Sequence, residues 1–238
     1  MTAKAPLLRL TLLSFLLAAT SAASSGLSEK ACQGEECCIC EHGGSQSPID
    51  IGGVTRAHLP RLEFHYRRAA LVELVADGAK ETIKATFLAP RPVLTIGGET
   101  FFLDELHFHS PGEHKIRGAG AAMELHLVHR NQAGEVAVVG ALMTPAPNRP
   151  NPVFARILAN AGPVPRQLRI QTEALLPADR HYFRYAGSLT TGNCAEGVRW
   201  HVLRSPLVVS PEQVAAYPFP DTARAVQPLN GRPVLGSH

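Results

Sequence analysis

Two short segments with alternating histidines constrain the fold of this chain more than any other feature. One residue separates His107 from His109, and one residue separates Glu124 from His126. Side chains alternate between the two faces of an extended strand, so each pair projects from a single face. The second segment follows the first at a hairpin's length. The pattern therefore predicts neighbouring strands with imidazoles gathered on one face of a sheet.

Most of the remaining pattern also indicates strands. Gly97-Gly98 is typical of a hairpin turn, and no internal repeat or composition break divides the chain. Helices are predicted from Pro152 to Gly162, after an Asn151 cap, and over 211–217, capped by Ser210. The sequence therefore predicts one mostly-β (α+β) domain. Its strands are expected at 62–66, 71–75, 81–87, 92–96, 100–109, 122–129, 136–143, 198–203 and 207–209.

The first 23 residues are predicted to be a cleaved signal peptide. Lys4 and Arg9 precede an apolar core over 10–19, and small residues follow it. This core is too short to span a membrane. We therefore expect an exported protein, periplasmic or secreted, without a stable membrane anchor.

Composition limits the kinds of partner. The chain is 45% hydrophobic and 18% charged, which is enough apolar sequence to bury a substantial core. Its formal net charge is only +3. Without a strong basic stripe, nucleic acid is excluded as the expected partner.

Five cysteines all lie after the predicted signal peptide: Cys32, Cys37, Cys38, Cys40 and Cys194. An exported protein meets an oxidising compartment, where disulfides form. Because five is odd, at least one thiol is expected to be free, intermolecular or metal-bound.

The histidine pattern predicts a metal site. Three neutral imidazoles converging on one point favour zinc, with a fourth position open to water, and an open position is typical of catalysis. Glu124 is placed to accept the second N–H of His126 and fix its tautomer. The alternative is that these histidines are ordinary hydrogen-bonded residues and Glu124 a solvated strand residue.

Five ordered segments resemble the alpha-class carbonic anhydrases, and the exported bacterial branch in particular. The resemblance runs from about residue 40 to the C-terminus. It implies a large twisted, mainly antiparallel central sheet of about ten strands, with a few short peripheral helices and long loops. The segments are Gln46-Ser47-Pro48-Ile49-Asp50-Ile51, the two histidine segments, the stretch from Tyr182 to Trp200, and Val226-Gln227-Pro228-Leu229-Asn230-Gly231-Arg232.

The resemblance implies a zinc enzyme that hydrates carbon dioxide to bicarbonate. His107, His109 and His126 would hold Zn²⁺, which makes hydroxide available at neutral pH, and weak esterase activity is possible. Thr190 would accept a hydrogen bond from the hydroxide and donate its own proton to Glu113. The positions matching the substrate pocket are Val128, Val138, Leu189, Thr191, Val198 and Trp200. From the pattern alone, the apolar members of that set are more typical of ordinary core residues, and only the resemblance favours a pocket.

The resemblance also implies a disulfide between Cys40 and Cys194, as in exported members. Together with the predicted signal peptide (1–23), the extent of the resemblance predicts a Cys-rich arm (24–39) and one catalytic domain (40–238). The arm is open to three interpretations: a disordered segment with one extra disulfide, a small soft-metal site, or intermolecular pairing. Adjacent Cys37 and Cys38 are not expected to bridge each other.

Three positions depart from the family pattern. The turn at 77–80 lacks the histidine that commonly relays protons, and Lys80 is a poor substitute because its reference pKa is about 10.4. Glu105 stands where a glutamine commonly supports the first ligand, and its charge is expected to make the zinc less electropositive. Thr222 replaces a common asparagine. The competing hypothesis is a non-catalytic zinc-binding or interaction module, and a monomer or homodimer is expected.

Overall fold

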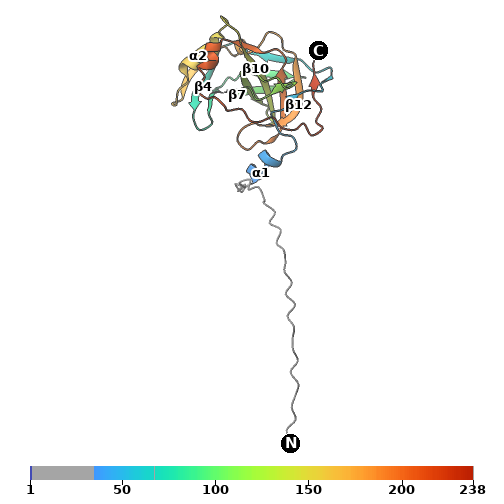
Figure 1. The fold of residues 1–238 in the computed structure, drawn as a ribbon. Helices are drawn as coiled ribbons and strands as arrows, with labels where there is room; N and C mark the ends of the chain where they lie inside the picture. The colour runs from blue at the N-terminus through green and yellow to red at the C-terminus, as the bar shows by residue number, and fades with distance from the viewer. Residues whose placement is uncertain (2–34, 67, 238) are drawn as a thin grey trace. The chain divides into compact units, whose positions relative to one another are not determined.

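The computed structural model describes Met1, residues 35–66 and residues 68–237. The predicted signal peptide and most of the Cys-rich arm lie outside the described residues. Within them the chain forms one large twisted sheet with short helices at its periphery (Figure 1).

A 13-stranded sheet dominates the fold. Its strands are β2 (Thr55–Arg56), β3 (Leu62–His65), β4 (Ala70–Asp77), β5 (Thr82–Phe87), β6 (Val93–Ile96), β7 (Glu99–His109), β9 (Met123–Arg130), β10 (Val136–Pro145), β11 (Arg166–Ile170), β12 (Tyr182–Ser188), β13 (Glu196–Leu203), β14 (Leu207–Val209) and β15 (Leu235–Gly236). The main path runs β11-β4-β5-β7-β9-β10-β13-β12-β15-β2. A separate two-stranded sheet pairs β1 (Asp50–Ile51) with β8 (Lys115–Ile116).

The predicted fold class is confirmed, although the sheet has more strands than the ten expected. Strands β11 and β12 were not predicted from the sequence, and the sheet is mixed where β10 pairs in parallel with β13 and β14. The turn at Gly97-Gly98 is present, with φ of 60° and 84°. Strand β10 is buried over most of its length, as its unbroken apolar run predicts.

Two predicted helices form where their capping residues indicate. Helix α2 (Pro152–Asn160) begins after Asn151, whose side chain accepts the N–H groups of Val153 and Phe154. Helix α3 (Pro211–Ala215) begins with a capping box between Ser210 and Gln213. Helix α1 (Glu35–His42) was not predicted, because its sequence lacks an apolar stripe. It crosses the boundary expected between arm and domain. A short 3₁₀ helix, η1 (Thr172–Leu175), completes the set.

The two faces of the central strands pack against different clusters. Leu106, Phe108, Leu125 and Leu127 belong to the larger hydrophobic core, which also takes in the buried face of α2. A second, smaller cluster forms around Trp200. The alternation in β7 and β9 thus directs leucine and phenylalanine to the main core and the histidines to the opposite face.

Candidate metal centre

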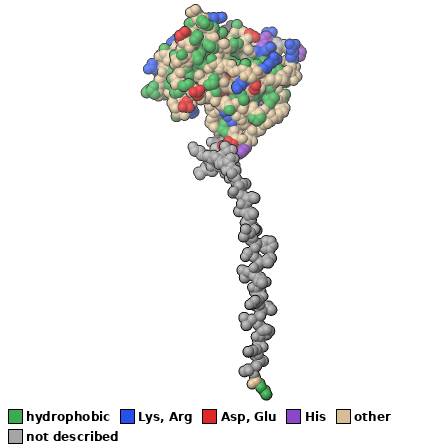
Figure 2. Space-filling model, viewed as in Figure 1, with side chains coloured by type: hydrophobic (Ala, Val, Ile, Leu, Met, Phe, Trp, Pro, Cys, Tyr) green, Lys and Arg blue, Asp and Glu red, His purple; other side chains and the backbone are tan. Residues whose placement is uncertain are grey.

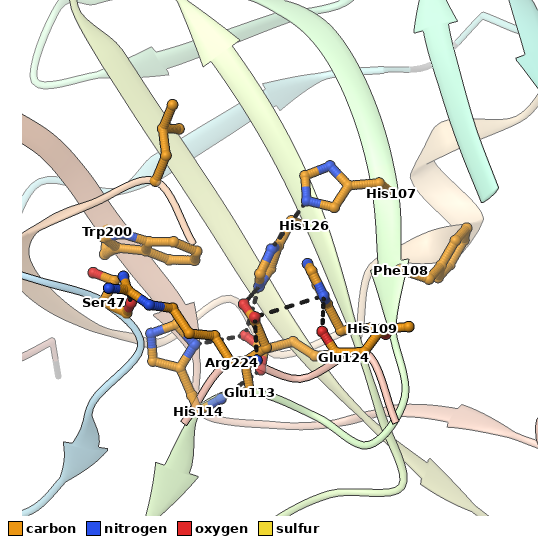
Figure 3. Close-up of polar contacts among 12 residues, drawn as sticks. Ser47, His107, Phe108, His109, Glu113, His114, Glu124, His126, Trp200 and Arg224 are labelled. Carbon is orange, nitrogen blue, oxygen red and sulfur yellow. Dashed lines mark hydrogen bonds and ion pairs between the residues drawn. The ribbon is translucent and has the colours of Figure 1, made fainter. Parts of the chain in front are cut away.

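The histidine cluster is built by direct pairing of β7 with β9. His107 lies opposite His126 in this antiparallel register, and His109 lies opposite Glu124. The three imidazole ring centroids are 4.7 to 5.1 Å apart. One nitrogen from each ring lies within 4.8 Å of the corresponding nitrogens of the other two, and Figure 3 shows the rings turned toward one another.

The nitrogens facing the centre fit a divalent ion. Nε2 of His107 is 3.3 Å from Nδ1 of His126. Two nitrogens bound to one tetrahedral zinc ion at its usual bond lengths lie about 3.3 Å apart. Nε2 of His109 is buried and has no hydrogen-bond partner among the described residues. A buried ring nitrogen without a partner is costly unless a ligand satisfies it. The donor set therefore suits zinc.

The remaining nitrogen of His126 faces a buried carboxylate. Its Nε2 lies 3.0 Å from Oε1 of Glu124, while His114 approaches the same oxygen at 2.7 Å through Nδ1. The backbone N–H of His114 donates to Oε2 at 2.8 Å. Burial alone would raise the pKa of Glu124, but His114 and His126 outweigh it and hold that pKa well below its usual range. Glu124 is therefore a buried anion that fixes the His126 ring.

His114 extends this contact into the protein and was not predicted as a site residue. Its Nε2 lies 2.7 Å from the hydroxyl of Tyr185, which is 2.8 Å from Oγ of Ser47. All three side chains are buried. The space for Glu124 comes from Gly140, where a Cβ atom would lie 3.0 Å from Oε1 of Glu124. Residues of β9, β10 and β12, together with Ser47, thus position His126.

His109 is supported by the C-terminal part of the chain. Its Nδ1 lies 3.4 Å from the backbone carbonyl oxygen of Thr222. Because this contact does not involve the side chain at position 222, threonine can stand where an asparagine is common. The Thr222 side chain instead accepts the N–H of Ser110. Burial, together with His126 and His107, lowers the pKa of His109 to about 2. The ring is therefore neutral and retains the lone pair that a metal ligand requires.

His107 is supported by Glu105 on its own strand and by Lys84 on the adjoining strand β5. Oε1 of Glu105 lies 3.2 Å from its Nδ1, and Nζ of Lys84 lies 3.7 Å from Oε2 of the same carboxylate. Lys84 is the direct cross-strand neighbour of His107. Burial would raise the pKa of Glu105, but His107, Lys84 and Lys80 lower it. Glu105 is therefore ionised and its charge is balanced by a lysine.

Glu113 lies below the histidines with one oxygen unengaged. Its Oε1 accepts the backbone N–H of Arg224 at 3.0 Å, while its buried Oε2 has no hydrogen-bond partner among the described residues. Burial raises the pKa of Glu113, and the side chain of Thr190 acts to lower it. Thr190, itself buried, is thus beside the carboxyl to which the resemblance assigns it.

Most of the expected pocket residues pack beside His126. Val128, Val138 and Trp200 occupy adjacent positions on β9, β10 and β13, and the Trp200 ring lies 4.9 Å from that of His126. Val198 belongs to the same cluster, and Leu189 packs against it. Thr191 is exposed. These residues make an apolar wall next to the histidines while also forming the second core cluster.

The expected disulfide between Cys40 and Cys194 is present. It joins α1 to the loop that follows β12, where Thr190 lies. Arg224 reinforces the junction, donating to the carbonyl oxygens of Cys40 and Ser47 and to Oε1 of Gln46. The loop beside the histidines is therefore fixed by a covalent bond and by one half-buried arginine.

A large twisted sheet on which three imidazoles converge, with an oxygen beside the outer nitrogen of each ring, defines a class of β-sheet protein with a candidate metal site. The comparisons identify the family within this class. Residues 28–238 match the model of the eukaryotic-type carbonic anhydrase. The chain belongs to that family.

Named relatives agree over most of the chain. A carbonic anhydrase of Klebsiella pneumoniae is 38% identical over 208 residues, covering 84% of this chain and 83% of the relative. One from a Nostoc species is 35% identical, covering 83% and 77%. The alpha-carbonic anhydrase of Thermovibrio ammonificans, solved with the inhibitor sulfanilamide, is 34% identical with a TM-score of 0.78, covering 84% of this chain and 90% of that one.

Proposed function

We propose that this chain hydrates carbon dioxide reversibly to bicarbonate and a proton, using zinc held by His107, His109 and His126. The observation that carries the proposal is the convergence of three imidazole nitrogens, with an oxygen within 3.4 Å of the outer nitrogen of each ring. Membership of the carbonic anhydrase family supports it. When bound, zinc supplies the Lewis acidity that gives hydroxide near neutral pH, with a pKa of about 7 that is already established for carbonic anhydrases.

Thr190 and Glu113 orient the attacking oxygen in this proposal. The unengaged Oε2 of Glu113 accepts the hydroxyl proton of Thr190, which leaves the Thr190 oxygen able only to accept. The Thr190 oxygen would then accept the hydrogen of the attacking oxygen, and this contact would leave a lone pair of that oxygen directed at the carbon of the substrate. Orientation of this kind lowers the barrier because fewer unproductive arrangements remain.

The apolar wall suits an uncharged substrate. Carbon dioxide offers few hydrogen-bonding groups, so valine, leucine and tryptophan hold it without competing donors. We assign this wall to Val128, Val138, Leu189, Val198 and Trp200, with Thr191 at the exposed side. Slow ester hydrolysis by the same hydroxide is a further expected activity.

The signal peptide (1–23), Cys-rich arm (24–39) and catalytic domain (40–238) remain part of the proposal. The disulfide supports export to the periplasm or the medium, because such bonds persist in oxidising compartments. No helix among the described residues has the length and hydrophobicity needed to cross a membrane. A monomer or homodimer stays a prediction.

The test combines zinc analysis with stopped-flow hydration of carbon dioxide on the full chain. We expect one zinc per chain and catalysis, with both lost in His126→Ala. The matched control is His181→Ala, which removes an exposed histidine outside the cluster. Zinc at one per chain without hydration would favour the alternative, a non-catalytic zinc-binding module. Absence of zinc from the unaltered chain would refute both.

A further inference from the structure

A second polar site lies at the edge of the sheet where the chain ends. A cavity of about 530 Å³ is lined there by Arg56, Arg117 and Arg204, and no acidic side chain lines it. Gly236 and Ser237 form part of the same lining. Figure 2 shows basic side chains gathered, with histidines, at the upper right of the molecule, where Figure 1 places the C-terminal end.

Backbone hydrogen bonds hold the three arginines in place from three separate segments. Arg56 on β2 pairs with Gly236 on β15. The N–H of Arg117 donates to the carbonyl of Ile51, and the N–H of Arg204 donates to the carbonyl of His181. The backbone at each arginine is therefore fixed, so that only the side chains must be ordered when a ligand binds.

Two of these arginines have no partner among the described residues. No ion pair or hydrogen bond engages the side chain of Arg56 or Arg117 within residues 35–66 and 68–237. Arg204 donates to the carbonyl of Ser237 at 3.3 Å and lies over the ring of Phe183. Asp50 lies beside the 117–118 turn, where it accepts the N–H of Gly118. It does not line the cavity. The cavity therefore gathers positive charge without neutralising it locally.

The turn that carries Arg117 is unfavourable for an arginine. Arg117 has φ of 51° and Gly118 has φ of 80°. Two successive positive φ values favour asparagine or glycine at the first position. An arginine held there against local preference is the kind of outlier from which a functional role is inferred.

Gly236 in the lining packs closely against Val54, which also lines the cavity. A Cβ atom at this position would lie 2.8 Å from Cγ1 of Val54. Ile51, Ile116 and Phe183 complete an apolar back wall. A ligand can therefore present several anionic groups to the arginines while its body rests against apolar surface.

We propose that this cavity binds a small soluble anion bearing two or more phosphate, sulfate or carboxylate groups. Arginine suits such groups because its planar guanidinium donates two parallel hydrogen bonds to adjacent oxygens. Two unpaired guanidiniums and a third beside them match a multiply charged ligand better than a single bicarbonate ion. None of the cavity residues belongs to the histidine cluster, so this site is separate from the proposed active site.

The test is isothermal titration calorimetry of the full chain with pyrophosphate. The site is removed in Arg56→Gln/Arg117→Asn, where asparagine suits the left-handed turn and preserves it. The matched control is Arg166→Gln, which removes an exposed positive charge on β11 outside the cavity. A second comparison, Arg117→Lys, retains the charge but not the paired donors. Thermal unfolding of each variant checks that it folds.

We expect saturable one-to-one binding of pyrophosphate that weakens by roughly tenfold or more in the double variant, because charge-assisted hydrogen bonds are lost. Arg166→Gln should bind as the unaltered chain does, and Arg117→Lys should be intermediate. No saturable binding, or equal loss in Arg166→Gln, would overturn the proposal. Sedimentation with phosphatidylglycerol vesicles without binding of pyrophosphate would also overturn it, by identifying a lipid surface instead.

Discussion

The buried carboxylate of Glu124 offers the sharpest test of how the histidine cluster is built. Its two oxygens accept three N–H groups, one from His126 and two from His114, at 2.7 to 3.0 Å. Glu124→Gln keeps the shape but replaces one oxygen with an amide NH₂. Whichever way the amide faces, its NH₂ meets at least one donor, so at least one hydrogen bond is lost.

The expected magnitude follows from that count. A hydrogen bond to a charged group contributes about 1.5–3 kcal/mol. Loss of the outer partner of a metal-ligating histidine typically weakens metal affinity about 10- to 100-fold, or roughly 1.4–2.7 kcal/mol. We therefore expect zinc affinity to fall within this range in Glu124→Gln. The apoprotein should also unfold at a lower temperature, since the lost bond is buried.

The assay is competition for zinc with a chelator of known affinity, with thermal unfolding of the apoprotein measured in parallel. Glu105→Gln is the matched control, because it makes the same chemical change beside His107. There an amide oxygen can still accept the His107 N–H in a partly exposed position. Affinity in the control should change less than in Glu124→Gln. Equal affinities for Glu124→Gln and the unaltered chain would refute the reasoning.

Three further changes probe the loop, the core and proton transfer. Cys194→Ser opens a bond that spans 154 residues and is worth about 5 kcal/mol in the chain-entropy model. Guanidinium unfolding should show lower stability, and stopped-flow assays should show lower turnover. Unchanged turnover would show that the disulfide is not needed for the function of this loop. Gly187→Ala should destabilise the fold by about 1–3 kcal/mol or more, because its Cβ would lie 2.1 Å from Oγ of Ser47 and 2.9 Å from the Trp200 ring. Wild-type stability on urea unfolding would contradict this packing. Added imidazole buffer should raise the hydration rate, and Lys80→His should reduce that dependence, while a rate independent of buffer would show that proton export is not limiting.

Local pattern was sufficient to predict much of the fold. Alternation predicted the strands that carry the histidines, and Asn151 and Ser210 marked the starts of α2 and α3. The pattern failed at β12. There Gly187 lies inside the end of the strand for a reason outside the strand itself, the close approach of Ser47 and Trp200. A glycine required by a distant segment looks the same in sequence as one that ends a strand.

The site residues likewise fall into those that local pattern predicts and those that it does not. The ligand set was predictable because one strand supplies two histidines and its neighbour supplies the third. His114 and Arg224 were not predicted as partners, since the first meets Tyr185 from 71 residues away and the second meets Cys40 from 184 residues away. Residues so distant in sequence give no periodic signal. Only the sheet order brings them together.

Glu105 illustrates why a charge in a site cannot be interpreted from its own position. Considered alone, a carboxylate beside His107 adds a negative charge to the cluster and is expected to weaken the metal as a Lewis acid. The register of β5 against β7 places Lys84 directly across from His107 and within 3.7 Å of that carboxylate. The pair carries no net charge, so most of the expected effect is cancelled at its source. A neutral glutamine and a lysine-balanced glutamate are therefore two ways to give His107 an acceptor without leaving a net charge beside the metal.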